Sequence, residues 1–238
     1  MTPQVPGEVR GVADDLIAAL GDDLAALLWH GSWAAGEQTP ESDHDMIVVL
    51  KTVDDDVLKS IERIFRGRSG WSTFVKSEQE LRQYPLSGRL QFHYSFVTLH
   101  GGIDAPPVTR GGLSQDLRTW AATINHECRY RIIHGAARED SDAETGFIRR
   151  RNARWMYYQA KIAVMAIKAR ELLLGRDYPA NRAELRERLT DPEELSIVDS
   201  VDGWHELREQ AEDDFVPTAL LLDRFARNVV RQLDETKV

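Results

Sequence analysis

Two short segments carry the residues that are best suited to chemistry. Gly31 and Ser32 end one apolar run, and Asp43 and Asp45 precede a second apolar run at residues 46–50. Side chains two residues apart on a strand point to the same face. We therefore expect the two carboxylates to lie side by side at the mouth of a buried strand. Adjacent carboxylates repel one another unless a cation lies between them, and such oxygen ligands suit Mg²⁺.

The Gly-Ser pair predicts a turn that approaches a phosphate. Glycine permits a close approach of the backbone, so the N–H groups of Gly31 and Ser32 could bind a phosphate group. An Asp-x-Asp pattern alone is also typical of a solvated turn. In combination with a Gly-Ser turn and an apolar strand on each side, it predicts metal-assisted phosphoryl or nucleotidyl transfer.

This stretch, WHGSWAAGEQTPESDHDMIVVL, resembles the signature of the nucleotidyltransferases with a polymerase-β-like fold. Within that superfamily it is most similar to the aminoglycoside nucleotidyltransferases of the kanamycin type. The resemblance implies that Gly31, Ser32 and Ser42 bind the nucleotide and that Asp43 and Asp45 bind Mg²⁺. It also implies a helical second domain and suggests a homodimer.

Two features depart from that pattern. Most of the superfamily has a third acidic residue on the next strand, whereas the expected strand at 71–75 has no carboxylate. Kanamycin-type enzymes also place an arginine in the signature loop, whereas residues 31–50 contain no Lys or Arg. The charge of a triphosphate must then be met by residues elsewhere in the chain.

The resemblance also implies a general base on a helix of the second domain, and Glu127 is the best match. Glu127 borders the apolar face of a predicted helix, and partial burial would suit a base that works near neutral pH. Arg131 follows one turn later and could contact phosphate. A plain surface ion pair between these two residues is the alternative, and Glu139 and Glu144 are alternative bases.

A long helical pattern at residues 147–174 offers the positive charge that the signature loop lacks. Lys161 is the strongest candidate for nucleotide binding there, because it lies among apolar and aromatic residues. The basic residues of this region are Arg149, Arg150, Arg151, Arg154, Lys161, Lys168, Arg170 and Arg176.

The hydrophobic periodicity predicts an α+β fold, with an α/β domain at residues 1–105 and a helical domain at 113–238. The resemblance implies that the first is a nucleotidyltransferase domain and the second a helical bundle. A linker is expected at 103–112. Strands are expected at 24–32, 46–50, 71–75 and 89–102. Helices are expected at 12–20, 54–65, 117–132, 147–174, 181–189 and 218–233.

Charge is distributed unevenly along the 238 residues. Residues 1–60 hold twelve acidic and three basic residues, and the rest of the chain holds 27 of each, which gives the net charge of −9. This balance argues against a nucleic-acid partner. The single cysteine indicates a cytoplasmic protein, and we expect no membrane-spanning segment.

The residues and the resemblance together predict a Mg²⁺-dependent enzyme. It would transfer a nucleoside monophosphate from a nucleoside triphosphate, with ATP preferred, to a hydroxyl of a small polar acceptor such as an aminoglycoside, and release pyrophosphate. An acidic cleft would attract such a polycation. Transfer of AMP to a protein partner and a non-catalytic nucleotide-binding module remain alternatives.

Overall fold

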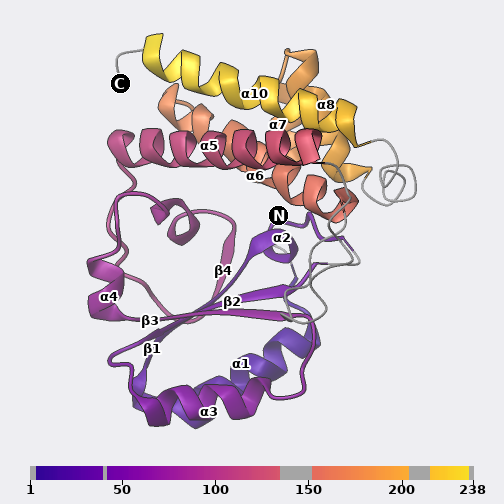
Figure 1. The fold of residues 1–238 in the computed structure, drawn as a ribbon. Coiled ribbons are helices and arrows are strands. Elements are labelled where there is room, and N and C mark those ends of the chain that lie inside the picture. The colour runs from indigo at the N-terminus through magenta and orange to yellow at the C-terminus, as the bar shows by residue number, and fades with distance from the viewer. Residues whose placement is uncertain (1–3, 40–41, 135–151, 204–214, 236–238) are drawn as a thin grey trace. The chain divides into compact units, whose positions relative to one another are not determined.

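The computed structural model describes residues 4–39, 42–134, 152–203 and 215–235. The chain divides into two compact units, Met1–Thr109 and Arg110–Val238, which we call the sheet unit and the helical unit (Figure 1). The predicted class, an α/β part followed by a helical part, is confirmed. None of the helices within the described ranges is long and apolar enough to cross a bilayer.

The sheet unit contains a four-stranded mixed sheet in the order β3-β2-β1-β4. β1 pairs antiparallel with β2 and with β4, whereas β2 and β3 are parallel. The strands are β1 Leu24–His30, β2 His44–Leu50, β3 Trp71–Ser77 and β4 Phe96–Gly101.

Each face of this sheet is covered by its own apolar cluster. α1 (Gly7–Leu20) and α3 (Asp55–Phe65) lie on one face (Figure 1), where Trp29 and Val48 are buried. On the other face Ile47 packs with residues of α4 and of the 3₁₀ turn η2. Because strand side chains alternate between faces, neighbouring residues of β2 belong to different clusters.

The expected strand at 89–102 is wrong in its first half. η2 (Arg89–Phe92) is a 3₁₀ turn that begins after Gly88, which has φ +81°. The Arg89 guanidinium donates to the backbone carbonyls of Tyr84 and Pro107. These contacts hold the segment in a turn, and pairing with β1 begins only at Phe96.

The sheet unit also contains short helices that the hydrophobic pattern does not predict. α4 (Glu78–Arg82) begins with a capping box in which Ser77 and Glu80 exchange hydrogen bonds. The 3₁₀ turn η1 (Gly21–Asp23) links α1 to β1.

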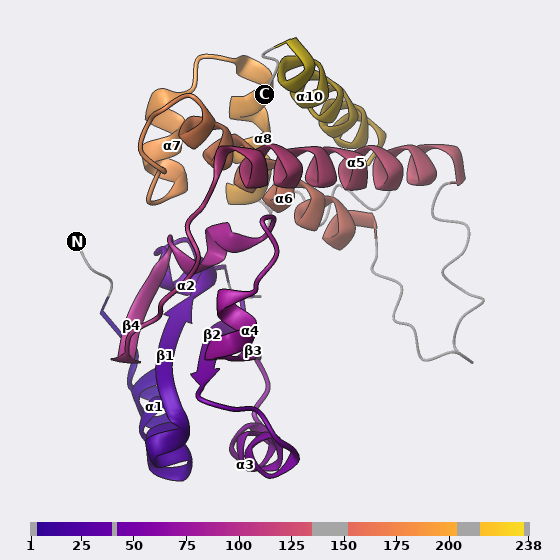
Figure 2. The same ribbon diagram turned by 90° about the vertical axis from the view of Figure 1, so that its left-hand side faces the viewer.

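The helical unit is built around α5 and α10, which lie side by side (Figure 2). Arg118 pairs with Asp234 at 2.8 Å and Asn125 with Asp223 at 2.9 Å, so the two helices run antiparallel. The helices are α5 Arg110–His134, α6 Asn152–Leu173, α7 Arg182–Arg188, α8 Pro192–Asp202 and α10 Val216–Glu235. α8 is absent from the sequence prediction.

The predicted apolar face of α5 is confirmed. Leu117, Ile124 and Cys128 on this face are buried. Burial raises the pKa of the Cys128 thiol to about 12, so this thiol is protonated near neutral pH and a poor nucleophile.

Two adjacent glycines at the end of β4 allow a matched test of the sheet geometry. Gly101 has φ +60°, and a Cβ there would lie 2.0 Å from the carbonyl oxygen of Ala25. Gly102 has open space around it. We expect Gly101→Ala to lower the free energy of unfolding by about 2 kcal/mol or more, because it combines backbone strain with a clash. Gly102→Ala should change it far less in urea denaturation, and equal losses would contradict this register.

Candidate active site

The end of β1 and the start of β2 lie side by side at one end of the sheet. Their antiparallel register pairs His30 with Asp45, so Gly31, directly after β1, comes against the Asp45 carboxylate. Gly31 has φ +81°, and a Cβ there would lie 2.1 Å from Asp45 Oδ2. Any larger residue would displace this carboxylate or the turn. Gly31 therefore allows the backbone of the turn to lie close to Asp45, the second aspartate of the Asp-x-Asp motif.

The Gly-Ser pair opens the short helix α2 (Gly31–Ala34). The first N–H groups of a helix have no acceptor within the helix, so such a turn can donate to an anion. Its carbonyl groups are engaged in the loop that follows. Gly31 accepts from the Ala35 N–H at 3.0 Å, and Ser32 accepts from the Glu37 N–H at 2.7 Å.

Asp43 and Ser42 belong to the loop before β2. The strand begins at His44, so β2 orients Asp45 while the loop places Asp43, whose side chain is exposed. The Ser42 hydroxyl accepts from the Thr39 N–H at 2.9 Å, and the Ser42 carbonyl accepts from the Trp33 indole N–H at 3.0 Å. These bonds give Ser42 a structural role in the loop, and nucleotide binding by Ser42 stays a prediction.

His44, between the two aspartates, points to the opposite face of the sheet, as strand alternation predicts. It is 6% exposed, and its Nε2 lies 2.9 Å from Glu8 Oε1 on α1. Its ring packs against Trp33 and Trp71, with centroid distances of 4.6 and 5.0 Å. This set fixes the start of β2, and the sequence pattern gave no sign of the contribution from Glu8.

The cross-strand partner of Asp45 carries no charge that would oppose a bound cation. Burial lowers the pKa of His30, its cross-strand partner, to about 4, so His30 is neutral near pH 7 and places no positive charge there. Among the residues described, no three His, Cys, Asp or Glu side chains form a metal-binding group. Mg²⁺ is commonly held by one or two carboxylates together with phosphate and water. Asp43 and Asp45 could provide the carboxylates.

The position of the missing third carboxylate can be assigned. In the parallel register of β2 and β3, Asp45 pairs with Ser72. Paired residues on neighbouring strands share a face, so an acidic residue at 72 would lie beside Asp45. The exposed serine there leaves this strand without a carboxylate next to the motif.

The helical unit brings Glu127 and Arg131 together around Trp155. The Trp155 indole N–H donates to Glu127 Oε2 at 2.7 Å, and the Arg131 guanidinium lies 4.7 Å from the centroid of the Trp155 ring. Trp155 is buried, whereas Glu127 and Arg131 are half-buried. The pair is therefore held by an aromatic residue of α6. The alternative bases Glu139 and Glu144 lie outside the described residues.

The other basic candidates are dispersed. Lys161 Nζ lies over the ring of Tyr157, 5.4 Å from its centroid. Arg170 and Arg176 form ion pairs with Glu194 and with Glu171 inside the helical unit, so the positive charge counted along this segment is partly neutralised. Lys168 is buried. Arg149, Arg150 and Arg151 lie outside the described residues, as does the side chain of Arg154.

Two glycines test the contact between the turn and Asp45. Gly31 and Gly36 both have positive φ, but a Cβ at Gly36 would meet nothing within 4 Å. We expect Gly31→Ala to weaken binding of MgATP at least tenfold, a loss of about 1.4 kcal/mol, because the new methyl group displaces Asp45. Gly36→Ala carries the backbone strain alone and should leave the affinity within about twofold. Equal affinities in calorimetry would show that the contact is not needed.

The chain is similar to known proteins in fold and not in sequence. No family model matches the chain, and no curated protein matches its sequence. Among solved structures it is similar to the spectinomycin adenyltransferase AAD(9) from Enterococcus faecialis, which was solved with ATP and spectinomycin. The two chains are 11% identical, the match covers 91% of this chain and 97% of that one, and the TM-score is 0.53. The chain therefore shares the fold of this adenyltransferase, a sheet part followed by a helical part.

Proposed function

We propose that the protein is a nucleotidyltransferase that moves a nucleoside monophosphate from a nucleoside triphosphate, preferably ATP, to a hydroxyl group. The observation that carries this proposal is the packing of Gly31 against the Asp45 carboxylate. It brings the turn that we propose for phosphate binding next to the carboxylate that we propose for metal binding, and nucleotidyl transfer needs both. The fold shared with an adenyltransferase supports the same conclusion.

In this proposal the residues of the sheet unit bind the triphosphate. The N–H groups of Gly31 and Ser32 donate to its phosphate oxygens. Asp43 and Asp45 hold Mg²⁺, which when bound neutralises charge on the triphosphate and on the pyrophosphate leaving group. His44 acts from the opposite face by keeping the start of β2 in place.

The acceptor proposed is a small polycationic molecule with hydroxyl groups, such as an aminoglycoside. The structural neighbour was solved with spectinomycin, and residues 1–60 of this chain carry a net charge of −9. Negative charge around a site raises the local concentration of a cationic substrate.

Removal of either carboxylate tests the metal site. We expect Asp43→Asn and Asp45→Asn to reduce Mg²⁺-dependent pyrophosphate release by a factor of about 10³ or more, since each removes charge stabilisation of the transition state. The measurement is pyrophosphate release with ATP and a panel of aminoglycosides. Asp22→Asn changes an exposed acid of the same unit and should keep wild-type rates. Wild-type turnover in the Asp43 and Asp45 variants would refute the assignment.

The base assigned in this proposal is Glu127, which would accept the proton of the attacking hydroxyl. The hydrogen bond from the Trp155 indole N–H orients its Oε2. Arg131, held against the same ring, is the proposed phosphate contact on this unit, and Lys161 is a further one.

A double-mutant cycle tests this assignment. We expect Glu127→Gln to lower turnover by a factor of about 10² to 10⁴ and Trp155→Phe to lower it by about tenfold. Because Trp155 would act through Glu127, its replacement should have little further effect in the Glu127→Gln background. Glu187→Gln, an exposed change on α7, is the control. Unchanged turnover of Glu127→Gln at every pH would exclude this base.

Ser72 supports a second candidate function, a nucleotide-binding module without catalysis. It occupies the position beside Asp45 where a third carboxylate would lie. Nucleotide binding in calorimetry, with no pyrophosphate release from any small-molecule acceptor, would favour this alternative. A labelled protein band after incubation with labelled ATP and a cell lysate would instead identify a protein acceptor.

A further inference from the structure

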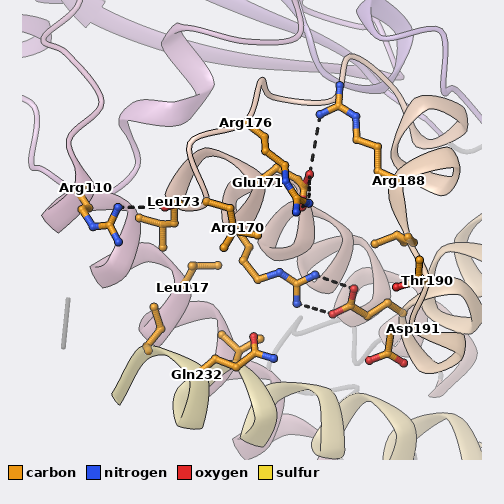
Figure 3. A pocket seen from close by; sticks show the side chains of 15 residues that line it. Arg110, Leu117, Arg170, Glu171, Leu173, Arg176, Arg188, Thr190, Asp191 and Gln232 are labelled. Carbon is orange, nitrogen blue, oxygen red and sulfur yellow. Dashed lines mark hydrogen bonds and ion pairs between the residues drawn. The ribbon is translucent and has the colours of Figure 1, made fainter. Parts of the chain in front are cut away.

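The helical unit contains a pocket of about 430 Å³. It is lined by the first turns of α5, the end of α6, the start of α8 with the residues before it, and the last turns of α10 (Figure 3). Leu117 of the pocket precedes Glu127 by ten residues on α5, which is roughly 15 Å along the helix axis. The pocket contains none of the residues to which the proposed function gives a role.

The two buried carboxylates of this pocket are already compensated by arginines. Glu194 is 6% exposed and receives a bidentate pair of hydrogen bonds from Arg170 at 2.5 and 2.7 Å. Glu171 is 2% exposed and pairs with Arg176 at 3.2 Å and with Arg188 at 4.0 Å. Figure 3 shows Glu171 and the arginines Arg170, Arg176 and Arg188 in the pocket wall. A cationic ligand would have to compete with these guanidinium groups for the same oxygens.

Arg110 is the arginine of the pocket without a carboxylate partner in the described part of the chain. Its Nη1 donates to the backbone carbonyl of Leu173 at 3.0 Å. It is also the first residue of α5, where the helix dipole disfavours a cation and favours an anion. With four arginines and three acidic residues, the lining carries a net charge of +1. One negative charge beside Arg110 would neutralise the net charge of the pocket lining.

The remaining wall of the pocket is apolar apart from Thr190 and Gln232. Leu117 from α5, Leu173 from α6 and Leu233 from α10 contribute side chains to it. The backbone carbonyl that Arg110 binds belongs to one of these residues, Leu173, so the positive group and the apolar wall are adjacent (Figure 3). A ligand that satisfies both has one anionic group and an apolar body.

We infer that this pocket binds a small apolar monocarboxylate. Its carboxylate pairs with Arg110 at the start of α5, and its apolar body packs against Leu117, Leu173 and Leu233. Such a ligand connects α5, α6 and α10, and it stabilises the helical unit by mass action because the unfolded chain has no such pocket. The site is independent of the nucleotidyl transfer proposed above.

Octanoate and 1-octanol test the inference on the full-length protein, because they differ only in the charged group. We expect octanoate to bind saturably in calorimetry and to raise the melting temperature, with 1-octanol at least about tenfold weaker. Acetate, which lacks the apolar body, should also bind at least about tenfold more weakly.

Variants of two arginines on α5 locate the site. Arg110→Gln should weaken octanoate binding about tenfold or more, while the weaker affinity for 1-octanol stays the same. Arg118→Gln is the matched control: it changes an arginine that pairs with Asp234 outside the pocket, and it should leave octanoate binding unchanged. The inference is overturned if octanoate at about 10 mM does not bind, if 1-octanol binds equally well, or if Arg110→Gln has no effect.

Discussion

The contact between Gly31 and the Asp45 carboxylate is the constraint on which the candidate active site depends. A Cβ at Gly31 would lie 2.1 Å from Asp45 Oδ2, so this glycine lets the turn and the carboxylate occupy neighbouring space. The antiparallel register of β1 and β2 produces the contact, because it places the residue after one strand against the beginning of the other. The same contact joins the two elements that the proposed transfer requires, a turn for phosphate and an oxygen ligand for a cation.

Strand alternation separates the structural and chemical tasks of β2. His44 points into the cluster formed with Trp33 and Trp71 and is bound by Glu8 of α1, while the next residue, Asp45, points to the opposite face. A group fixed from behind in this way loses little further freedom when it binds a ligand. The anchoring set therefore helps to hold Asp45 in one place for the metal and nucleotide binding that we propose.

Local patterns predicted β1, β2 and β3 well, because each is an apolar or β-branched run bounded by turn residues. They failed where distant residues decide the structure. The sequence before Phe96 has the pattern of a strand. Arg89, however, donates to the carbonyls of Tyr84, which precedes it in the chain, and of Pro107, which follows it, and these bonds hold a turn. The sequence also suggested that the basic residues of the predicted helix at 147–174 are available to bind a triphosphate. In the structure Arg170 forms an ion pair with Glu194 of α8. The Asp-x-Asp spacing identified the candidate site, whereas its anchor at Glu8 is 36 residues from His44 and left no sequence signal.

The most direct test of this account is a crystal structure with Mg²⁺ and a non-hydrolysable ATP analogue. The account predicts a metal ion within about 2.1 Å of oxygens from both Asp43 and Asp45, with the phosphates against the N–H groups of Gly31 and Ser32. A nucleotide bound elsewhere, or a metal ion held without Asp45, would contradict it.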